Sequence, residues 1–219
     1  MTLRVQNDFA RRLFGFAIFK IPRHDADMNT QTHIIMGAAL FGRPAPRLAI
    51  AGALGGLIPD LPMLIIIIGL RVLGYPLSEI FGKIYWEYWW QVSNAIGHSF
   101  ILWGAVLIIS LLAKDRNWAG FGVALSGSAL LHSIIDFLCH RDDAHMHFWP
   151  LTEWRFRSPI SYWDNAYYGT QFSLFEAALG LVFIIVLWRR YSQKWIKALL
   201  ALSAIAYAAV PAFFIFGTG

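Results

Sequence analysis

Long uncharged apolar runs, separated by short segments that carry most of the charge, are the dominant pattern along the chain. A transmembrane helix needs about 20 apolar residues, within a range of roughly 17–25. The runs that reach this length contain at most one acidic residue each. They are Leu48 to Leu70, Tyr88 to Ala113, Asn117 to Ile135, Phe172 to Trp188 and Ala198 to Gly219. A further uncharged run, Met28 to Gly42, is shorter than the length needed to span a membrane.

The runs are rich in Ala, Gly and Leu, and they show none of the alternation of apolar and polar residues that is typical of a half-buried strand. We therefore expect an all-α fold: a polytopic membrane helical bundle with about four to six transmembrane helices.

Polar and basic segments divide the chain into three parts. Residues 1–27 hold five basic residues around a short apolar patch, which predicts a basic amphipathic N-terminal extension. Residues 28–219 are expected to form a single helical membrane domain. Within this domain, residues 141–170 form a polar connection that is longer than the usual loop between helices. We interpret this connection as an interfacial polar loop.

Composition supports a membrane protein and excludes other classes. Hydrophobic residues make up 58% of the chain, charged residues only 14%, and the mean hydropathy is +0.52. This excludes a disordered chain and argues against an ordinary soluble enzyme. The net charge is +5, and the basic residues flank the apolar runs. The expected partner is therefore the lipid bilayer rather than a stable nucleic-acid partner. The oligomeric state stays open. The single cysteine excludes an internal disulfide and a multi-cysteine zinc site.

The strongest chemical signal is the spacing H-x3-D-x3-H formed by His132, Asp136 and His140. On a helix these residues share one face within an arc of about 80°, with neighbours about 6 Å apart along the axis. Imidazole with carboxylate suits zinc, iron or manganese, so His132 and Asp136 can share one ion and His140 can help to bind a second. An intrahelical hydrogen-bond ladder or ion pair is the alternative.

Three further residues are predicted to complete the metal site. His33 lies near the start of the Met28–Gly42 segment, Asp60 follows Pro59 at the end of the next helix, and His98 opens the helix before the one with His132. If residues 43–47 form the tip of a helical hairpin, His33 and Asp60 return to one end of it. All six residues can then meet at one membrane face. The alternatives are a helix cap for His33, a turn residue for Asp60 and an interfacial imidazole for His98.

The segment after His140 adds a second polar group. Asp143 and His145 are candidates for the general base or for further metal ligands, and Asp142 and His147 are further candidates beside them. Arg155 and Arg157 are candidates for binding a phosphate. The alternatives are a solvated loop and arginines that extend to lipid headgroups.

These residues resemble the YdjM-like family, membrane-bound predicted metal-dependent hydrolases. The matching order is an early His33, a Pro-Asp at residues 59–60, a His-Ser at residues 98–99, the H-x3-D of His132, a Trp-Pro at residues 149–150 and an R-F-R at residues 155–157. The family is thought to be distantly similar to zinc phospholipase C and P1-type nucleases. The resemblance therefore implies two or three zinc ions and a phosphoester substrate. Unlike the family's frequent P-D-x-D, Leu61 and Pro62 follow Asp60.

Basic residues indicate the membrane orientation, because they favour the cytoplasmic side. Those predicted to lie opposite the site are Arg43, Arg47, Arg71, Lys114, Arg116, Arg189, Arg190, Lys194 and Lys197. If the N-terminal extension is counted with the site face, the two sets are nearly equal and decide nothing; with the extension left out, the set opposite the site is clearly the larger. We expect an integral protein of a bacterial inner membrane with its site on the outer, periplasmic face.

The resulting hypothesis is a membrane-embedded metal-dependent hydrolase that acts on a lipid or nucleotide-like phosphoester. The alternative is a non-catalytic membrane protein, such as a metal or proton carrier or an assembly partner, because intramembrane Asp and His residues also serve proton relays. A third reading places a haem between His98 and His132.

Overall fold

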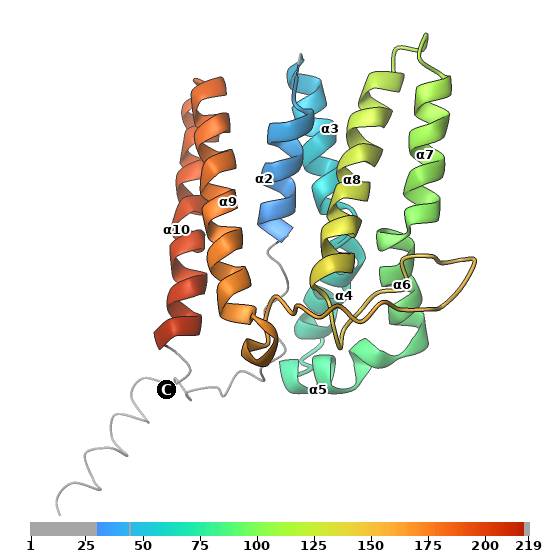
Figure 1. Ribbon diagram of the computed structural model, residues 1–219, viewed down its shortest axis with the longest axis vertical. Coiled ribbons are helices and arrows are strands. Elements are labelled where there is room, and N and C mark those ends of the chain that lie inside the picture. Colours follow the sequence, from blue (N-terminus) through green and yellow to red (C-terminus); the bar gives the residue numbers. More distant parts are fainter. Residues whose placement is uncertain (1–29, 44, 217–219) are drawn as a thin grey trace, which may run out of the picture.

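The protein is a bundle of helices, and the part of the chain that the computed structural model describes, residues 30–43 and 45–216, contains no strand (Figure 1). The predicted extension at residues 1–27 lies outside this part. The expected all-α membrane bundle is confirmed. Its helices are α2 (Thr30–Phe41), α3 (Pro46–Leu57), α4 (Leu61–Val72), α5 (Leu77–Gly82), α6 (Tyr88–His98), α7 (Phe100–Leu112), α8 (Ala119–Cys139), α9 (Gly169–Arg190) and α10 (Lys194–Phe216), with short 3-10 helices η1 (Ile84–Trp86) and η2 (Asn165–Tyr167).

Three stretches of the described chain are long and apolar enough to cross a membrane: α6 with α7, α8, and α9. The pair α3 and α4 makes a fourth span if it is counted as one, although its two helices are bent by 60° at the break between them. The run from Leu48 to Leu70 is therefore not one straight helix. Pro59 precedes the break and Pro62 lies in the first turn of α4, where a missing N–H is tolerated.

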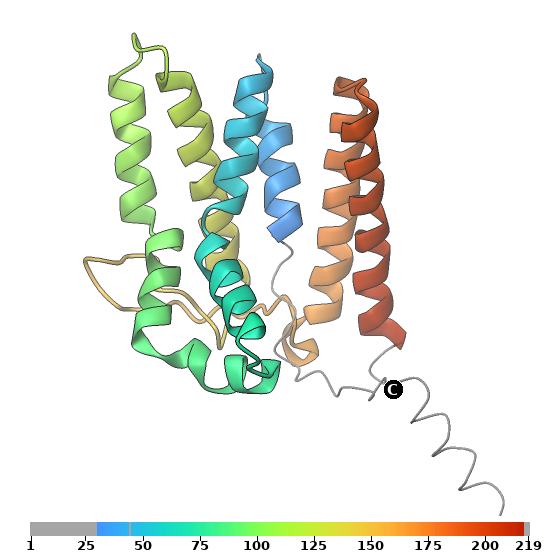
Figure 2. The same ribbon diagram turned by 180° about the vertical axis from the view of Figure 1, so that it is seen from behind.

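The centre of the bundle depends on close contact between helix backbones. Helices α2 and α3 run antiparallel and pack together, and α3 also packs along α8 (Figures 1 and 2). A Cβ atom added to Gly37 would lie 2.2 Å from the carbonyl oxygen of Gly52, and one added to Gly56 would lie 2.2 Å from that of His33. Small residues of this kind let helices approach closely where lipid supplies no hydrophobic driving force.

The connection after α8 runs across one end of the bundle, beside α4, α5 and α6 (Figure 1). Its backbone is anchored to the helices that it crosses: Phe100 N donates to His147 O, Ser158 N donates to His140 O, and Tyr162 N donates to Cys139 O. Helices α9 and α10 pack against each other, and α9 also contacts α2 on the side away from α7.

His98 is the last residue of α6, whereas the sequence had suggested that it opens a helix. The chain is extended at Ser99, whose Oγ accepts a hydrogen bond from Leu102 N and caps the start of α7. The same hydroxyl donates to Trp149 O, so the break is also fixed by the connection after α8. Tertiary contacts therefore divide an apolar run that reads as continuous.

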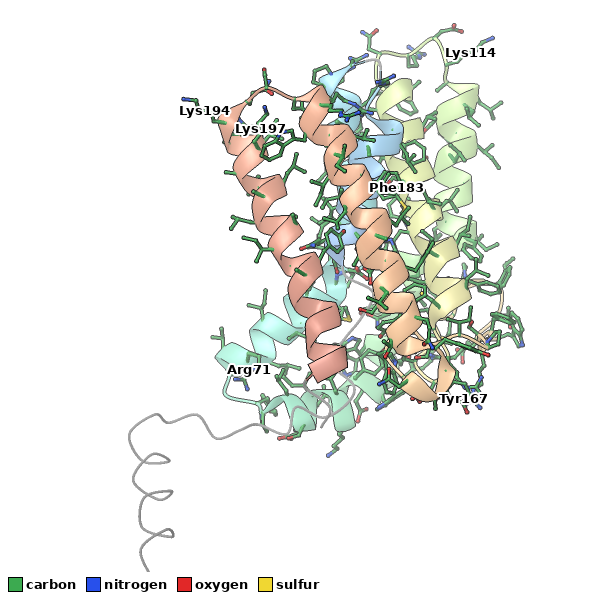
Figure 3. All side chains as sticks on the ribbon, turned by 60° about the vertical axis from the view of Figure 1, so that its left-hand side comes forward. Arg71, Lys114, Tyr167, Phe183, Lys194 and Lys197 are labelled. Atoms are coloured by element: carbon green, nitrogen blue, oxygen red, sulfur yellow. The ribbon has the colours of Figure 1, made fainter. Side chains whose placement is uncertain are left out.

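Arg71 lies at the same end of the molecule as Tyr167, whereas Lys114, Lys194 and Lys197 lie at the other end (Figure 3). The prediction that Arg71 lies opposite the site is wrong. The reason is that α4 continues from α3 toward the end where α5 and α6 lie, instead of returning (Figure 1).

Candidate metal centre

The structure brings together all six residues predicted as metal ligands. They meet toward the end of the bundle where α8 ends, and every one of them is buried. Their elements are α2 for His33, the break between α3 and α4 for Asp60, the end of α6 for His98, and α8 with its C-terminal cap for His132, Asp136 and His140.

A first group consists of Asp60, His98, His132 and Asp136, with one candidate ligand atom from each within 4.8 Å of all the others. Asp136 Oδ2 lies 3.1 Å from Nε2 of both His98 and His132. Asp60 Oδ1 lies 3.4 Å from the same two nitrogens. A tetrahedral zinc ion with bonds of about 2.0–2.1 Å holds its ligand atoms about 3.3–3.4 Å apart. The four distances therefore fit ligands around one ion.

The hydrogen bonds of the two imidazoles identify their tautomers. His98 Nδ1 lies 2.9 Å from Asn94 O, and His132 Nδ1 lies 2.9 Å from Gly56 O. Because a carbonyl oxygen only accepts, each Nδ1 carries a proton, and a neutral ring would therefore present the lone pair of its Nε2. Neither Nε2 makes a hydrogen bond within the described residues, although both face carboxylate oxygens. A metal ion between each Nε2 and the carboxylate oxygens would satisfy both, as would a proton on Nε2 that forms an ion pair.

Charge balance leads to the same requirement. Asp60 and Asp136 are buried, and no lysine or arginine of the described chain forms an ion pair with either. Buried carboxylates are normally paired with a cation or coordinate a metal. The donor set of imidazole nitrogens and carboxylate oxygens fits zinc, with iron and manganese as alternatives.

Thr30, which the sequence analysis did not single out, orients Asp60. Its Oγ1 donates to Asp60 Oδ2 at 2.7 Å, which leaves Oδ1 facing His98 and His132. Hydrogen bonds that hold a ligand in place are a regular part of metal sites. The weak signal in the sequence was a hydroxyl residue one helical turn before His33.

A second group shares Asp136 with the first. It consists of Asp136, His140 and His145, again with one ligand atom from each within 4.8 Å of the others. Asp136 Oδ1 lies 3.2 Å from His33 Nε2 and 3.9 Å from His140 Nε2. The two oxygens of Asp136 therefore face different residues. Oδ2 faces the first group, whereas Oδ1 faces His33 and the second group.

The carboxylate of Asp143 contacts the imidazole of His140. Asp143 Oδ2 lies 3.0 Å from His140 Nδ1 and accepts a hydrogen bond from Tyr162 Oη at 2.8 Å. Burial alone would raise the pKa of the Asp143 carboxyl, but the neighbouring His140 and the Tyr162 hydroxyl hold it below its ordinary value. A carboxylate in this position fixes the ring orientation of a histidine ligand.

His145 and His147 are both buried and both neutral. Burial, together with the neighbouring His98, holds the pKa of His145 well below its ordinary value. Burial also lowers the pKa of His147 to about 3. His145 stacks on His98, with the ring centroids 4.1 Å apart, and so joins the two groups. His147 instead contacts the rings of Phe100 and Phe137.

The two predicted phosphate-binding arginines lie in different surroundings. Arg155 is half-buried, and its Nη1 donates to Gln91 Oε1 and to Ala144 O, both at 2.7 Å, so it joins α6 to the segment that carries His145. Arg157 is exposed and pairs with Asp142 at the surface. Of the two, Arg155 is the one that the structure places against the elements of the site.

The family of the chain follows from a comparison with protein-family models. The model described as YdjM inner membrane protein matches residues 28–214. The chain belongs to this family. The YdjM match spans every residue of both ligand groups, and together with the apolar helices it makes the protein an integral inner membrane protein. Comparisons with curated proteins and with solved structures gave no match.

Proposed function

We propose that the protein is a membrane-embedded metal-dependent hydrolase with a two-metal centre bridged by Asp136. The observation that carries the proposal is the division of this carboxylate, with Oδ2 toward His98 and His132 and Oδ1 toward His33 and His140. The ions of two-metal sites lie about 3.5–4 Å apart, so a carboxylate whose two oxygens face different groups of ligands is suited to contribute to both. Zinc is the preferred ion, with iron and manganese as alternatives.

The chain's own residues would hold the ions and orient the ligands. Asp60, His98, His132 and Asp136 would bind the first ion, and Asp136, His140 and His145 the second. Such an ion would activate water as the nucleophile near neutral pH, because zinc lowers the pKa of water to about 7 in zinc enzymes. Asp143 was a candidate general base, but its contact with His140 Nδ1 favours a role in orienting that ring. His145, the other candidate base, lies where a ligand is needed.

A phosphoester is the proposed substrate class, of lipid or nucleotide-like type. Two divalent ions neutralise the charge that develops on a phosphoryl group, and Arg155 lies near enough to the segment with His145 to add a further positive charge. The suggested distant similarity to zinc phospholipase C and P1-type nucleases agrees with this class. The position of the site within a membrane protein favours a substrate that reaches it from the interface.

We place the site on the periplasmic side. Lys114, Lys194 and Lys197 lie at the end opposite Tyr167 and the connection after α8 (Figure 3). Short loops with an excess of lysine and arginine stay on the cytoplasmic side. With residues 1–27 left out of the comparison, Arg71 at the site end weakens this asymmetry without reversing it.

A metal carrier is the second candidate function, because the ligand atoms are deeply enclosed. The exposed fractions of His33, His98 and His132 are 1%, 1% and 0%, and Asp136 is 2% exposed. A catalytic metal needs a position open to substrate. In this structure Asp143, with a side chain 15% exposed, is the more accessible part of the cluster.

Elemental analysis by mass spectrometry of the detergent-purified full chain tests the proposal first. We expect about two ions per chain in the wild type, with both lost in Asp136→Ala. Asp115→Ala, which removes an exposed carboxylate at the far end, is the matched control. Hydrolysis of bis(p-nitrophenyl) phosphate by the metal-loaded protein would support the hydrolase. Zinc uptake into proteoliposomes without hydrolysis would favour the carrier, and protein without bound metal would refute both.

A further inference from the structure

Asn94 is a buried amide that has no hydrogen-bond partner among the described residues. It lies on α6, one turn before His98, and is 1% exposed. Neither its Oδ1 nor its Nδ2 makes a hydrogen bond within the described residues. The great majority of buried polar side-chain atoms in proteins are hydrogen-bonded, because an unpaired one loses its water without compensation. Two unpaired atoms on one side chain therefore indicate that the amide binds something other than the protein.

Helix geometry and two contacts show which way Asn94 faces. At 100° per residue it lies about 40° from His98 and about 60° from Gly97, on opposite sides. A Cβ atom added to Gly97 would lie 2.3 Å from Pro59 O, so the Gly97 side of α6 faces the break before α4. His98 faces the first ligand group. Asn94, between them, faces the boundary between Asp60 and the first turn of α4.

The same boundary is electrostatically suited to an anion. Helix α4 begins at Leu61, directly after Asp60, and its N-terminal end carries the positive end of the helix dipole. Leu61 N and Leu64 N already donate to Ile58 O and Asp60 O, and Pro62 has no N–H, so α4 contributes here through its dipole and not through these backbone donors. The side-chain N–H of Asn94 and the end of α4 thus favour negatively charged oxygen beside the same ligand pair, Asp60 and His98.

We propose that the Asn94 amide, with the first turn of α4, binds a phosphoryl oxygen of the substrate beside Asp60 and His98. The inference rests on the proposed function and goes beyond it by assigning a substrate-binding residue that is not a metal ligand. In this role Nδ2–H donates to a non-bridging phosphoryl oxygen. The amide is neutral, so it leaves the charge of the two ions to balance the phosphoryl group. Donors that are already oriented in a site shielded from water are effective in stabilising such oxygens.

Binding of inorganic phosphate to the zinc-loaded full chain tests the inference. The variants are Asn94→Leu, which removes both polar atoms at similar volume, and Asn94→Asp, which keeps the shape and replaces the donor with a negative charge. Asn117→Leu, at an exposed position of the far connection, is the control. Zinc content, the melting temperature and the phosphate Kd by titration calorimetry are measured for each.

We expect Asn94→Leu to keep its zinc, to melt no lower than the wild type, and to bind phosphate about tenfold or more weakly. Asn94→Asp should weaken phosphate binding further, and it provides the result if the leucine variant fails to fold. Phosphate binding within twofold of the wild type in a zinc-loaded Asn94 variant would overturn this inference alone. A wild type that binds no zinc would overturn the proposed function and the inference together.

Discussion

His132 Nε2 lies 3.1 Å from Asp136 Oδ2 without a hydrogen bond between the two side chains. The residues are one helical turn apart, and His132 is fixed at its other nitrogen by Gly56 O. Two electron-pair donors are thereby held close together in an apolar interior, an arrangement that is costly unless a cation lies between them. The distance suits two neighbouring ligands of one metal ion, and it equally suits an ion pair with a protonated imidazole.

The number of bound ions should depend on which ligand is removed. His140 contributes only to the second group, whereas Asp136 contributes to both. We therefore expect His140→Ala to retain about one ion per chain and Asp136→Ala to retain none. Elemental analysis of the purified variants measures this directly. Equal metal content in the two variants would contradict a shared carboxylate.

Loss of the Thr30 hydroxyl should weaken metal binding without removing a ligand. Thr30→Val deletes the donor to Asp60 Oδ2 and keeps a branched side chain of similar size. Changes of this kind reduce metal affinity roughly 10- to 100-fold. Competition with a fluorescent zinc chelator measures the affinity, and Thr170→Val, at a hydroxyl that bonds Asn165, is the control. Unchanged affinity in Thr30→Val would show that the hydroxyl does not orient Asp60.

A methyl group at Gly56 should destabilise the bundle. Its Cβ atom would lie 2.2 Å from His33 O, so α2 and α3 must separate. Overpacking in a close-packed core costs about 1–3 kcal/mol. Thermal unfolding in detergent should show a lower melting temperature for Gly56→Ala than for Gly104→Ala, because a Cβ at Gly104 meets no atom within 4 Å. Similar melting temperatures for both variants would argue against the close contact.

The proposed membrane orientation predicts which surface cysteines react from outside the cell. Cys139 is the single cysteine and is buried, so a Cys139→Ala background isolates introduced thiols. In intact bacterial cells, we expect an impermeant maleimide to label Thr152→Cys, in the connection at the site end. Lys194→Cys should react only after the cells are permeabilised. The reverse pattern would place the site on the cytoplasmic side.

The sequence was sufficient to predict the helical class and the meeting of the six residues. The helix period aligned His132, Asp136 and His140, and the basic Pro-rich segment between Phe41 and Leu48 predicted the hairpin that returns Asp60 to His33. These inferences succeeded because they depend on local geometry and on chain reversal, which the order of apolar and polar residues specifies.

Features that depend on contacts between distant segments were not predictable from the residues alone. The break at Ser99 is fixed partly by Trp149, fifty positions later in the chain. The end at which Arg71 lies depends on α4 continuing from α3 after a 60° bend. Nothing in the sequence distinguishes Thr30 and Asn94 from other polar residues, because their roles depend on the residues that each one faces in the fold.

The contact of Gly56 with both His33 and His132 links the metal centre to the order in which the protein is made. The carbonyl of Gly56 accepts from His132, and the backbone of the same residue packs on His33. The chain is synthesised from its N-terminus, so α2 and α3 can pair long before α8 enters the bilayer. In the proposed centre, the first ion would find its full set of ligands only after residue 136 has been inserted, and metal loading would be a late step in biogenesis.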